Sequence, residues 1–400
     1  MARSMTPLGA ATSTSIRQHL IDPETCIRCN TCESRCPSKA IRHERNYVVD
    51  PDKCNFCMKC VRPCPTGAVD HYFDLARPYS IDDQLLWIEL PSELAVQAAS
   101  ETGNSESSRG NQIAPVSTSD PPLNRYSREN PARAIVSSNT RVTGENAEND
   151  VRLIIFEFDE TPFEFIEGQS VGVIPPGLDA NGQPHAMRLY SVACPRDGEK
   201  PNAGNMSLAI KRIVWRDGLD REVRGVASNW LCDLRPGDAV DIVGPFGTDF
   251  LLPDDQDADL LMICTGTGAA PFRGFAHRRR RMWPNAGGKL MLIYGARTME
   301  DLPFSQTLQK YTQAEFRREL AFSRAIAGDR QYVQDRLRLC APEILWLLRR
   351  PKSHLYMCGL KGLEEGVDEA LIDITRTHGI NWLAFKSEMH VAGRYHVEVY

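Results

Sequence analysis

The chemistry of this 400-residue sequence begins with its cysteines. Thirteen are present, and eight of them lie between Cys26 and Cys64. They follow the spacing C-x2-C-x2-C-x3-C-P, and the pattern occurs twice because the segment 26–40 recurs as 54–68. An internal duplication of this kind predicts two stacked, pseudo-symmetric halves.

The spacing predicts two [4Fe–4S] clusters. Three thiolates two residues apart can bind one face of a cubane cluster, while the proline turns the fourth cysteine toward the other cluster. The predicted ligands of the first cluster are Cys26, Cys29, Cys32 and Cys64. The predicted ligands of the second are Cys54, Cys57, Cys60 and Cys36.

Zinc and disulfides are the alternatives for these cysteines. Zinc usually needs only paired C-x2-C units and has no use for a third cysteine followed by C-P. Disulfides require an oxidising compartment, which nothing else in the sequence indicates. Four further cysteines stand in apolar surroundings and are expected to be inert core residues: Cys194, Cys232, Cys264 and Cys340.

Two later motifs are suited to a nucleotide or a flavin. The segment 265–271 (TGTGAAP) follows an apolar strand and opens a helix, so its glycines allow the backbone to approach a pyrophosphate closely. The segment Arg188-Leu189-Tyr190-Ser191 offers an arginine for a phosphate, a tyrosine to stack on a flavin and a serine for flavin N5. Taken alone, a plain turn and an ordinary strand remain the alternatives for these two segments.

Residues from about 132 to 400 resemble the plant-type ferredoxin–NADP reductase family. The resemblance rests on motifs in matching order and spacing: EGQS at 167–170, GVIPPG at 172–177, RLYS at 188–191, GVASN at 225–229, TGTGAAPFR at 265–273, YMCGLKG at 356–362 and the terminal VEVY. It implies an antiparallel β-barrel that binds FAD, followed by a doubly wound α/β domain that binds NADP.

The resemblance also implies roles for individual residues. Arg188, Tyr190 and Ser191 would hold FAD, and Tyr400 would stack on the flavin face that nicotinamide must occupy. The implied catalytic residues at the hydride-transfer site are Ser191, Cys358, Glu398 and Tyr400. Further implied contacts of FAD or NADP are Leu189, Ala209, Ile210, Lys211, Val226, Ala227, Ser228, Thr267, Gly268, Ala296, Arg297, Gly359 and Leu360. Ala227 stands where the plant enzymes usually have cysteine, but the role of that position is chiefly its backbone.

The choice of coenzyme depends on the segment 323–332. Ser323, Arg324, Arg330 and Tyr332 match the family's cluster around the adenosine 2′-phosphate, with Arg330 where lysine is common. Either cation neutralises a phosphate. No acid stands at position 323 or 324, where one would favour NADH. We therefore expect NADPH, although the stretch between Arg324 and Tyr332 is shorter than in the family.

The elements that must position these residues form three modules. Short strands over 133–142, 151–158, 171–174, 187–192 and 207–214 predict the antiparallel barrel. Strands at 260–264, 290–295, 319–323 and 354–358 alternate with helices at 271–282, 304–315, 331–348 and 362–378, which predicts a parallel, doubly wound sheet. The expected division is a disordered tail over 1–20, an α+β two-cluster ferredoxin domain over 21–80, a connecting helical segment over 81–98, a flexible linker over 99–131, the FAD domain over 132–253 and the NADP domain over 254–400.

The bulk composition excludes some classes of function. With 42% hydrophobic residues, 25% charged residues and a formal charge of -5, nothing indicates nucleic-acid binding. The longest apolar stretches are too short to span a bilayer. We expect a cytoplasmic protein that binds neither nucleic acid nor membrane. The start of the sequence is rich in Ser and Thr and lacks an acid before Asp22, so a transit segment is the alternative to a disordered tail there.

The whole chain, from Cys26 to Tyr400, is similar to the reductase components of aerobic benzoyl-CoA epoxidase systems. The similarity implies that NADPH delivers hydride to FAD and that electrons leave singly, through the clusters, to a di-iron oxygenase that epoxidises benzoyl-CoA. Two alternatives stay open: a stand-alone NADPH–ferredoxin oxidoreductase, and an electron-relay scaffold with a degenerate flavin domain. The intact Ser191, Cys358, Glu398 and Tyr400 argue against the scaffold. The oligomeric state, a homodimer included, is left open.

Overall fold

The structure is a computed structural model that divides into two compact units, Met1–Ile113 and Ala114–Tyr400. It describes residues 16–23, 26, 30–44, 46–61, 64, 68–69, 72–87, 90–91, 94, 118, 120–158, 163–199, 204–309, 311–324 and 330–400. Cys29, residues 1–15 of the predicted tail and residues 99–117 of the predicted linker lie outside this set.

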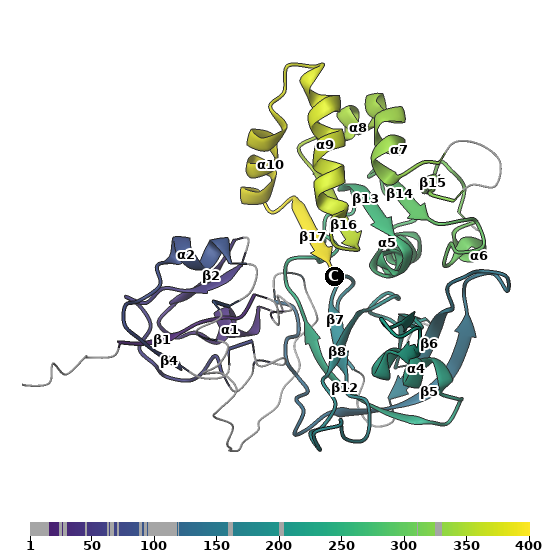
Figure 1. Ribbon diagram of the computed structural model, residues 1–400. Coiled ribbons are helices and arrows are strands. Elements are labelled where there is room, and N and C mark those ends of the chain that lie inside the picture. The colour runs from purple at the N-terminus through teal and green to yellow at the C-terminus, as the bar shows by residue number, and fades with distance from the viewer. Residues whose placement is uncertain are drawn as a thin grey trace, which may run out of the picture. The chain divides into compact units, whose positions relative to one another are not determined.

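The first unit is a small α+β fold with two antiparallel strand pairs (Figure 1). Its elements are β1 (Ile16–His19), α1 (Thr31–Arg35), β2 (Ile41–His43), β3 (Tyr47–Val49), β4 (Tyr72–Leu75) and α2 (Ile81–Leu86). Strand β1 pairs with β4, and β2 pairs with β3. The prediction of a disordered tail up to residue 20 was therefore wrong from Ile16 onward. The strand buries two polar residues, Gln18 and His19, and a hydrophobic pattern could not indicate that.

The predicted connecting segment over 81–98 belongs to the first unit as far as Leu94. Helix α2 begins with a capping box, in which Ser80 and Asp83 each accept a backbone N–H from the other. Buried Gln84 donates to the Val49 carbonyl and accepts from the Val49 N–H, both at 2.9 Å. Leu94 is buried in a small cluster with residues of β4. The segment therefore closes the core of this unit.

The second unit begins with a six-stranded antiparallel sheet in the order β8-β7-β12-β5-β6-β9. The strands are β5 (Ala132–Arg141), β6 (Val151–Phe158), β7 (Ser170–Val173), β8 (Arg188–Ser191), β9 (Asn205–Lys211) and β12 (Ala239–Phe246). A single bridge between Val192 and Leu208 links the end of β8 to β9. Closure of the sheet into a barrel remains a prediction. The predicted linker ends earlier than expected, because Tyr126 forms a bridge with Gly244.

Four elements of this half were missed or only partly predicted. Strands β10 (Val214–Arg216) and β11 (Glu222–Arg224) form a hairpin, and α4 (Val226–Asp233) follows directly. Only the start of β10 was included, at the end of the strand expected over 207–214. Strand β12 was missed because it contains Gly244-Pro245, a pair typical of turns.

The rest of the second unit is a five-stranded parallel sheet, as the alternation of strands and helices predicted. The order is β15-β14-β13-β16-β17. The strands are β13 (Asp259–Thr265), β14 (Leu290–Ala296), β15 (Arg317–Phe322), β16 (Ser353–Gly359) and β17 (Tyr395–Val399). A short helical turn, η1 (Gly266–Gly268), follows β13.

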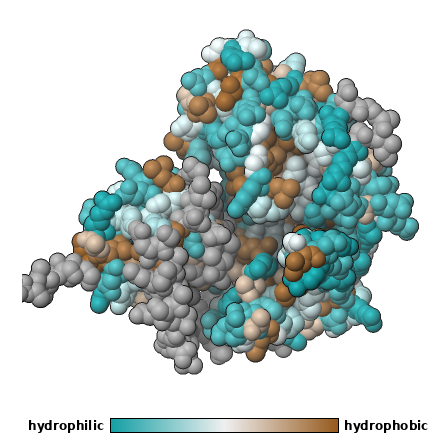
Figure 2. Space-filling view, in the orientation of Figure 1, coloured by the Kyte–Doolittle hydropathy of each residue, from teal (hydrophilic) through white to brown (hydrophobic). Residues whose placement is uncertain are grey.

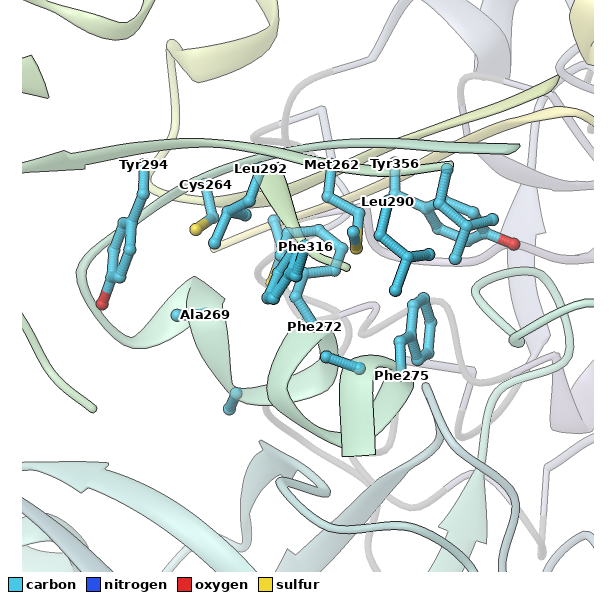
Figure 3. Packing of buried hydrophobic residues seen from close by; sticks show 14 of the residues in the cluster. Met262, Cys264, Ala269, Phe272, Phe275, Leu290, Leu292, Tyr294, Phe316 and Tyr356 are labelled. Carbon is cyan, nitrogen blue, oxygen red and sulfur yellow. The ribbon is translucent and has the colours of Figure 1, made fainter. Parts of the chain in front are cut away.

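Helices cover both faces of the parallel sheet. One face packs against α5 (Ala269–Met282) and α6 (Ser305–Leu308), and the other against α7 (Val333–Leu339), α8 (Ala341–Leu348), α9 (Leu363–Arg376) and α10 (Trp382–Val391). Figure 3 shows Phe272 and Phe275 of α5 pointing toward the strands that carry Met262, Leu290 and Tyr356.

Three helix predictions in this half need correction. The helix expected over 304–315 is only the single turn α6. The helix expected over 331–348 is divided at Cys340, where Pro342 suits the first turn of α8. Helix α10 was not predicted.

The surface of the described residues is mostly polar on the face seen in Figure 2, where hydrophobic side chains lie in small groups. No helix within the described ranges is both long enough and apolar enough to cross a membrane.

A buried ion pair connects several segments of the second unit. The Glu167 side chain is fully buried, and its Oε2 accepts from Arg196 Nη2 at 2.7 Å. Its Oε1 accepts from the backbone N–H of Arg196 at 2.7 Å, and Arg278 of α5 lies 3.8 Å away. The Glu167 carbonyl accepts from Leu252 N–H at 3.2 Å. Glu167 therefore joins the antiparallel sheet to the helical layer.

Replacing Glu167 is expected to destabilise this unit strongly. The change Glu167→Ala leaves Arg196 and Arg278 without their buried partner, and such a loss costs about 3 kcal/mol. Urea unfolding curves measure the change in the free energy of unfolding. Glu157→Ala, at an exposed position on β6, is the matched control and should change stability by less than about 0.5 kcal/mol. Equal effects of the two changes would contradict the role given to Glu167.

Candidate functional site

Three parallel strands bring the candidate catalytic residues to one edge of the sheet. In the strand register, Cys264 of β13 lies beside Cys358 of β16, and Cys358 lies beside Glu398 of β17. Ligands of open α/β sheets bind at the carboxyl ends of the strands, where these residues are. The structure therefore brings Cys358 and Glu398 together at the edge where a ligand is expected.

Glu398 also contacts the antiparallel sheet, through two serines. Ser170 of β7 and Ser191 of β8 lie opposite each other in the register. Ser170 Oγ donates to Glu398 Oε1 at 3.1 Å, and Ser191 Oγ donates to Oε2 at 3.2 Å. Burial raises the pKa of Glu398 above its usual range, although both serine hydroxyls act against the shift. The motif EGQS contains Ser170, but sequence reasoning gave this residue no role.

The Cys358 thiol is buried and uncharged. Burial raises its pKa well above the ordinary value, and the nearby Glu398 and Cys264 add to the shift. The glycine-rich turn after β13 lies directly against this strand, because a Cβ on Gly268 would stand 2.1 Å from the Cys358 carbonyl oxygen. Gly268 is thus required for the close approach. The other predicted core cysteines, Cys194, Cys232, Cys264 and Cys340, are buried as expected.

Tyr400 lies over the same edge and is half exposed. Its backbone N–H donates to the Gly359 carbonyl at 3.0 Å, and its phenol oxygen lies 2.7 Å from Thr267 Oγ1. The Thr265 hydroxyl is buried and has no hydrogen-bond partner among the described residues, and a Cβ on Gly359 would stand 2.5 Å from it. An unpaired buried hydroxyl beside two glycine-rich turns suits a polar ligand. Leu360, which follows, is exposed.

The predicted FAD residues line strands β8 and β9 and the start of α4. Arg188 is exposed and donates to the backbone carbonyls of Ala186 and Met187, while Leu189 and Tyr190 are half-buried. Helix α4 begins after Gly225, and no side chain in the described part of the chain caps it, so the N–H groups of its first turn are available to a phosphate. These first-turn residues are Val226, Ala227 and Ser228. Residues 209–211 lie on β9 beside this helix. The arrangement fits an FAD pyrophosphate.

Sequence reasoning missed an exposed tryptophan next to α4. Trp215 of the β10–β11 hairpin is 49% exposed, and its neighbour Val214 is exposed as well. The hairpin is joined to α4, because the Gly225 N–H donates to the Ile213 carbonyl at 2.9 Å and Ser228 Oγ accepts from Ile213 N–H at 3.2 Å. An exposed aromatic ring beside the start of a helix that suits a phosphate is also suited to stacking on a base. The segment WRDGLDREV at 215–223 contains a turn signal. A tryptophan beside a turn was the one clue in the sequence to this exposed ring.

The predicted coenzyme residues meet at the carboxyl ends of β14 and β15. Ser323 N–H donates to the Ala296 carbonyl at 3.0 Å, and Arg324 N–H donates to the Arg297 carbonyl at 2.8 Å. Residues 330–332 return to the same edge, because Gln331 N–H donates to the Phe322 carbonyl at 3.0 Å. Arg330 and Tyr332 are both exposed. The structure thus gathers the residues expected around a 2′-phosphate.

An acid that the sequence analysis did not anticipate lies in this group. Glu148 Oε2 forms an ion pair with Arg324 Nη1 at 2.5 Å, and Glu148 Oε1 forms one with Arg297 Nη1. The arginines hold the pKa of Glu148 below its ordinary value, the hydrogen bond from Arg297 contributing most. Glu148 is 176 residues from Arg324 in sequence, and no local motif marks it.

Four of the predicted cluster ligands line one cavity in the first unit. They are Cys36, Cys54, Cys57 and Cys60. Cys36 comes from the first copy of the repeat and the other three come from the second, which is the exchange of ligands that the C-P spacing predicted. Burial raises the pKa of Cys60 to about 11, and the other three thiols add to the shift.

The surroundings of Cys36 suit a thiolate that binds a cluster. The Ala40 N–H donates to Cys36 Sγ at 3.3 Å, and Ser38 Oγ lies 3.5 Å from the same sulfur. Burial alone would raise the pKa of Cys36, but these hydrogen bonds bring it below the ordinary value. Hydrogen bonds to ligand sulfurs are common around iron–sulfur clusters. No three His, Cys, Asp or Glu side chains in the described part of the chain form a single-ion site.

The remaining predicted cluster ligands lie close to the same core. Cys26, Cys32 and Cys64 pack in the hydrophobic cluster that also contains Cys60, and Cys32 is buried. The fourth predicted ligand of this set, Cys29, lies outside the described residues.

Comparison with known families gives two matches. Residues 18–65 match the 4Fe-4S dicluster domain, and residues 262–369 match the oxidoreductase NAD-binding domain. The chain is 39% identical over 293 residues to the cyanelle ferredoxin–NADP reductase of Cyanophora paradoxa, covering 70% of this chain and 80% of that protein. It is 38% identical over 309 residues to the ferredoxin–NADP reductase of Thermosynechococcus vestitus, covering 74% of this chain and 80% of that protein.

Solved structures show the same fold. The ferredoxin-NADP+ reductase of Plasmodium falciparum aligns with a TM-score of 0.56 and 24% identity over 70% of this chain and all of that one. A mutant of the same reductase, solved with 2′P-AMP, aligns with a TM-score of 0.56 and 25% identity over 70% of this chain and 99% of that one.

The exchange of cysteines between the two halves of the repeat can be tested by replacing single ligands. Cys36→Ser should perturb the same cluster as Cys60→Ser, and Cys64→Ser should perturb the other one, because each fourth ligand crosses over. Electron paramagnetic resonance of the reduced protein separates the two signals. Cys340→Ser, between α7 and α8, is a control that should leave both signals intact. If Cys36→Ser matched Cys32→Ser instead, the cross-ligation would be wrong.

Glu398→Gln tests the contact between the two sheets. The amide keeps the shape of the side chain but removes its charge, so the hydrogen bonds from Ser170 and Ser191 weaken and Ser191 is less well held. Misplacement of a positioning group can slow catalysis by about 10²-fold, so kcat for NADPH oxidation should fall by about that factor while KM changes little. Glu388→Gln, at an exposed position on α10, serves as the control. An unchanged kcat in Glu398→Gln would contradict the positioning role.

Proposed function

Because the chain belongs to the ferredoxin–NADP reductase family and carries a 4Fe-4S dicluster domain, we propose that it is the reductase of a benzoyl-CoA epoxidase system. In this proposal it oxidises NADPH and passes electrons, through FAD and two [4Fe–4S] clusters, to a di-iron oxygenase on another chain. The observation that carries the proposal is the joining of a hydride-transfer edge and a cluster module in one polypeptide.

The residues around Glu398 are arranged to hold a flavin and a nicotinamide in contact. Ser191 donates a hydrogen bond to Glu398, which fixes the orientation of the serine hydroxyl. The buried Cys358 thiol lies beside Glu398. Tyr400 covers the edge, so a nicotinamide would have to displace its ring to bind there, and its partial exposure is consistent with such a movement. Bound FAD supplies the conversion between a two-electron hydride donor and one-electron acceptors. The protein itself would position the flavin and the nicotinamide and exclude water from the space between them.

The coenzyme edge supports NADPH as the hydride donor. Arg324 and Arg330 would neutralise the 2′-phosphate, and Tyr332 would lie beside the adenosine. Ser323 would hydrogen-bond the same phosphate. The turn that ends with Gly268 would accept the pyrophosphate, because its glycines allow close approach of the backbone.

The cluster module supports single-electron delivery to a partner. The thiols of Cys36, Cys54, Cys57 and Cys60 surround one cavity and would hold one cluster. Cys26, Cys29, Cys32 and Cys64 would hold the second. Two clusters would supply the one-electron carriers between a flavin and an acceptor on another protein.

Two points support an oxygenase as the partner. One is the similarity, from Cys26 to Tyr400, to the reductase components of benzoyl-CoA epoxidase systems, and the other is that this sequence lacks a motif for oxygen activation. The sequence contains no Glu-x-x-His pair, which helices of di-iron proteins use, and Glu388-Met389-His390 has the wrong spacing. Oxygen activation therefore belongs to a separate protein. The rival function is a stand-alone NADPH–ferredoxin oxidoreductase, favoured by the names of the curated relatives.

The two functions differ in what accelerates NADPH consumption. The cluster-replete protein, purified without oxygen, is mixed under air with the partner oxygenase, and benzoyl-CoA is added or withheld. The proposal expects NADPH and oxygen use to rise sharply with benzoyl-CoA, and only when both proteins are present. A rate that ignores benzoyl-CoA but follows added ferredoxin would support the stand-alone reductase instead.

A further inference from the structure

The coenzyme edge contains an acid that comes from the antiparallel half of the unit. Glu148 lies in the loop between β5 and β6, and its two carboxylate oxygens each bind a different arginine. These arginines, Arg297 and Arg324, follow the neighbouring strands β14 and β15, and both belong to the predicted coenzyme site. A negative charge therefore occupies the position where a phosphate is expected to bind.

The loop that carries Glu148 is anchored at several points to the segment after β14. Asp301 Oδ1 accepts from the backbone N–H of Asn149 at 3.1 Å and from its side-chain Nδ2 at 3.0 Å. The Gly144 N–H donates to the Glu300 carbonyl at 2.8 Å, and Phe304 N–H donates to the Val142 carbonyl at 3.2 Å. Because its neighbour Asn149 is fixed, Glu148 is held close to the arginines.

The charges around Glu148 are strongly basic. Lys211 on β9 is half-buried, and its pKa is lowered first by burial and then by the nearby Arg297. Lys211, Arg297 and Arg324 therefore crowd one region, where Glu148 and Asp301 are the acids that offset them. Without an anion, these like charges would repel one another.

We propose that Glu148 is a built-in counter-anion that competes with the 2′-phosphate of the coenzyme and thereby sets the preference between NADPH and NADH. The proposal rests on the proposed coenzyme site. A 2′-phosphate must replace Glu148 on Arg324 and on Arg297, and it binds while a like charge remains close by. A ribose without the phosphate carries a 2′-hydroxyl, which can donate a hydrogen bond to Glu148 instead. Glu148 therefore weakens binding of the phosphorylated coenzyme and tolerates the unphosphorylated one.

Isothermal titration calorimetry with coenzyme fragments tests this proposal on the full-length, FAD-bound and cluster-replete protein. The probes are 2′,5′-ADP, which carries the 2′-phosphate, and 5′-ADP, which lacks it. Glu148→Gln should bind 2′,5′-ADP about fivefold more tightly than the wild type, because one like charge near the phosphate is removed. Binding of 5′-ADP should stay the same or weaken slightly. Glu145→Gln, an exposed acid in the same loop, is the matched control and should bind both probes as the wild type does.

The outcomes separate this inference from the coenzyme site on which it rests. If the wild type prefers 2′,5′-ADP and Arg324→Ala removes the preference, the coenzyme site stands. Unchanged or weaker binding of 2′,5′-ADP to Glu148→Gln would then overturn the inference alone, weaker binding indicating that Glu148 positions the arginines. A wild type that binds both probes equally would overturn the coenzyme site and the inference together. A gain of the same size in Glu145→Gln would show a general charge effect and would also overturn the inference.

Discussion

The Glu398 carboxylate is the contact on which the candidate hydride-transfer site depends. It lies at the end of the last strand of the parallel sheet and accepts hydrogen bonds from two strands of the antiparallel sheet. The two sheets come from separate stretches of the chain, and their edges must meet within hydrogen-bond distance for Ser191 and Cys358 to face one ligand. Glu167 supports the same junction from within the core, through its buried pair with Arg196.

Two acids of this unit illustrate how the environment decides the role of a carboxylate. Glu398 is surrounded by neutral hydroxyls and buried strand backbone, so its pKa is raised. Glu148 is exposed between two arginines, so its pKa is lowered. Burial therefore disfavours the charged form of the first, whereas the arginines favour the charged form of the second. Local composition predicts neither pKa: Glu398 was singled out only by its place in the terminal VEVY motif, and no motif contains Glu148.

The predictable features were those that are encoded locally. The cysteine motif lies within one short segment, and the motif of the glycine-rich turn at Gly268 spans seven residues. Both could therefore be recognised from the sequence. The parallel strands β13, β14 and β16 were found because each contains a mostly apolar run, as Leu260–Cys264 is. The missed features depend on distant contacts or on mixed composition. Strand β1 buries the polar residues Gln18 and His19, β12 contains Gly244-Pro245, and Glu148 reaches Arg324 across most of the second unit's sequence. Ser170 lay in a quoted motif, but only its pairing with Ser191 reveals its contact with Glu398.

The cluster module and the reductase each carry a core of their own. The buried hydrophobic clusters described in the structure each draw on one unit only, and Gln84 and Leu94 complete the core of the first. The cavity lined by Cys36 and Cys60 is therefore shaped by local packing, and so is the edge at Glu398. Packing within the first unit alone can keep the thiols of Cys36 and Cys60 at one cavity. The contacts of Ala40 N–H and Ser38 Oγ with the Cys36 sulfur then fix where that thiol lies, whatever the second unit does.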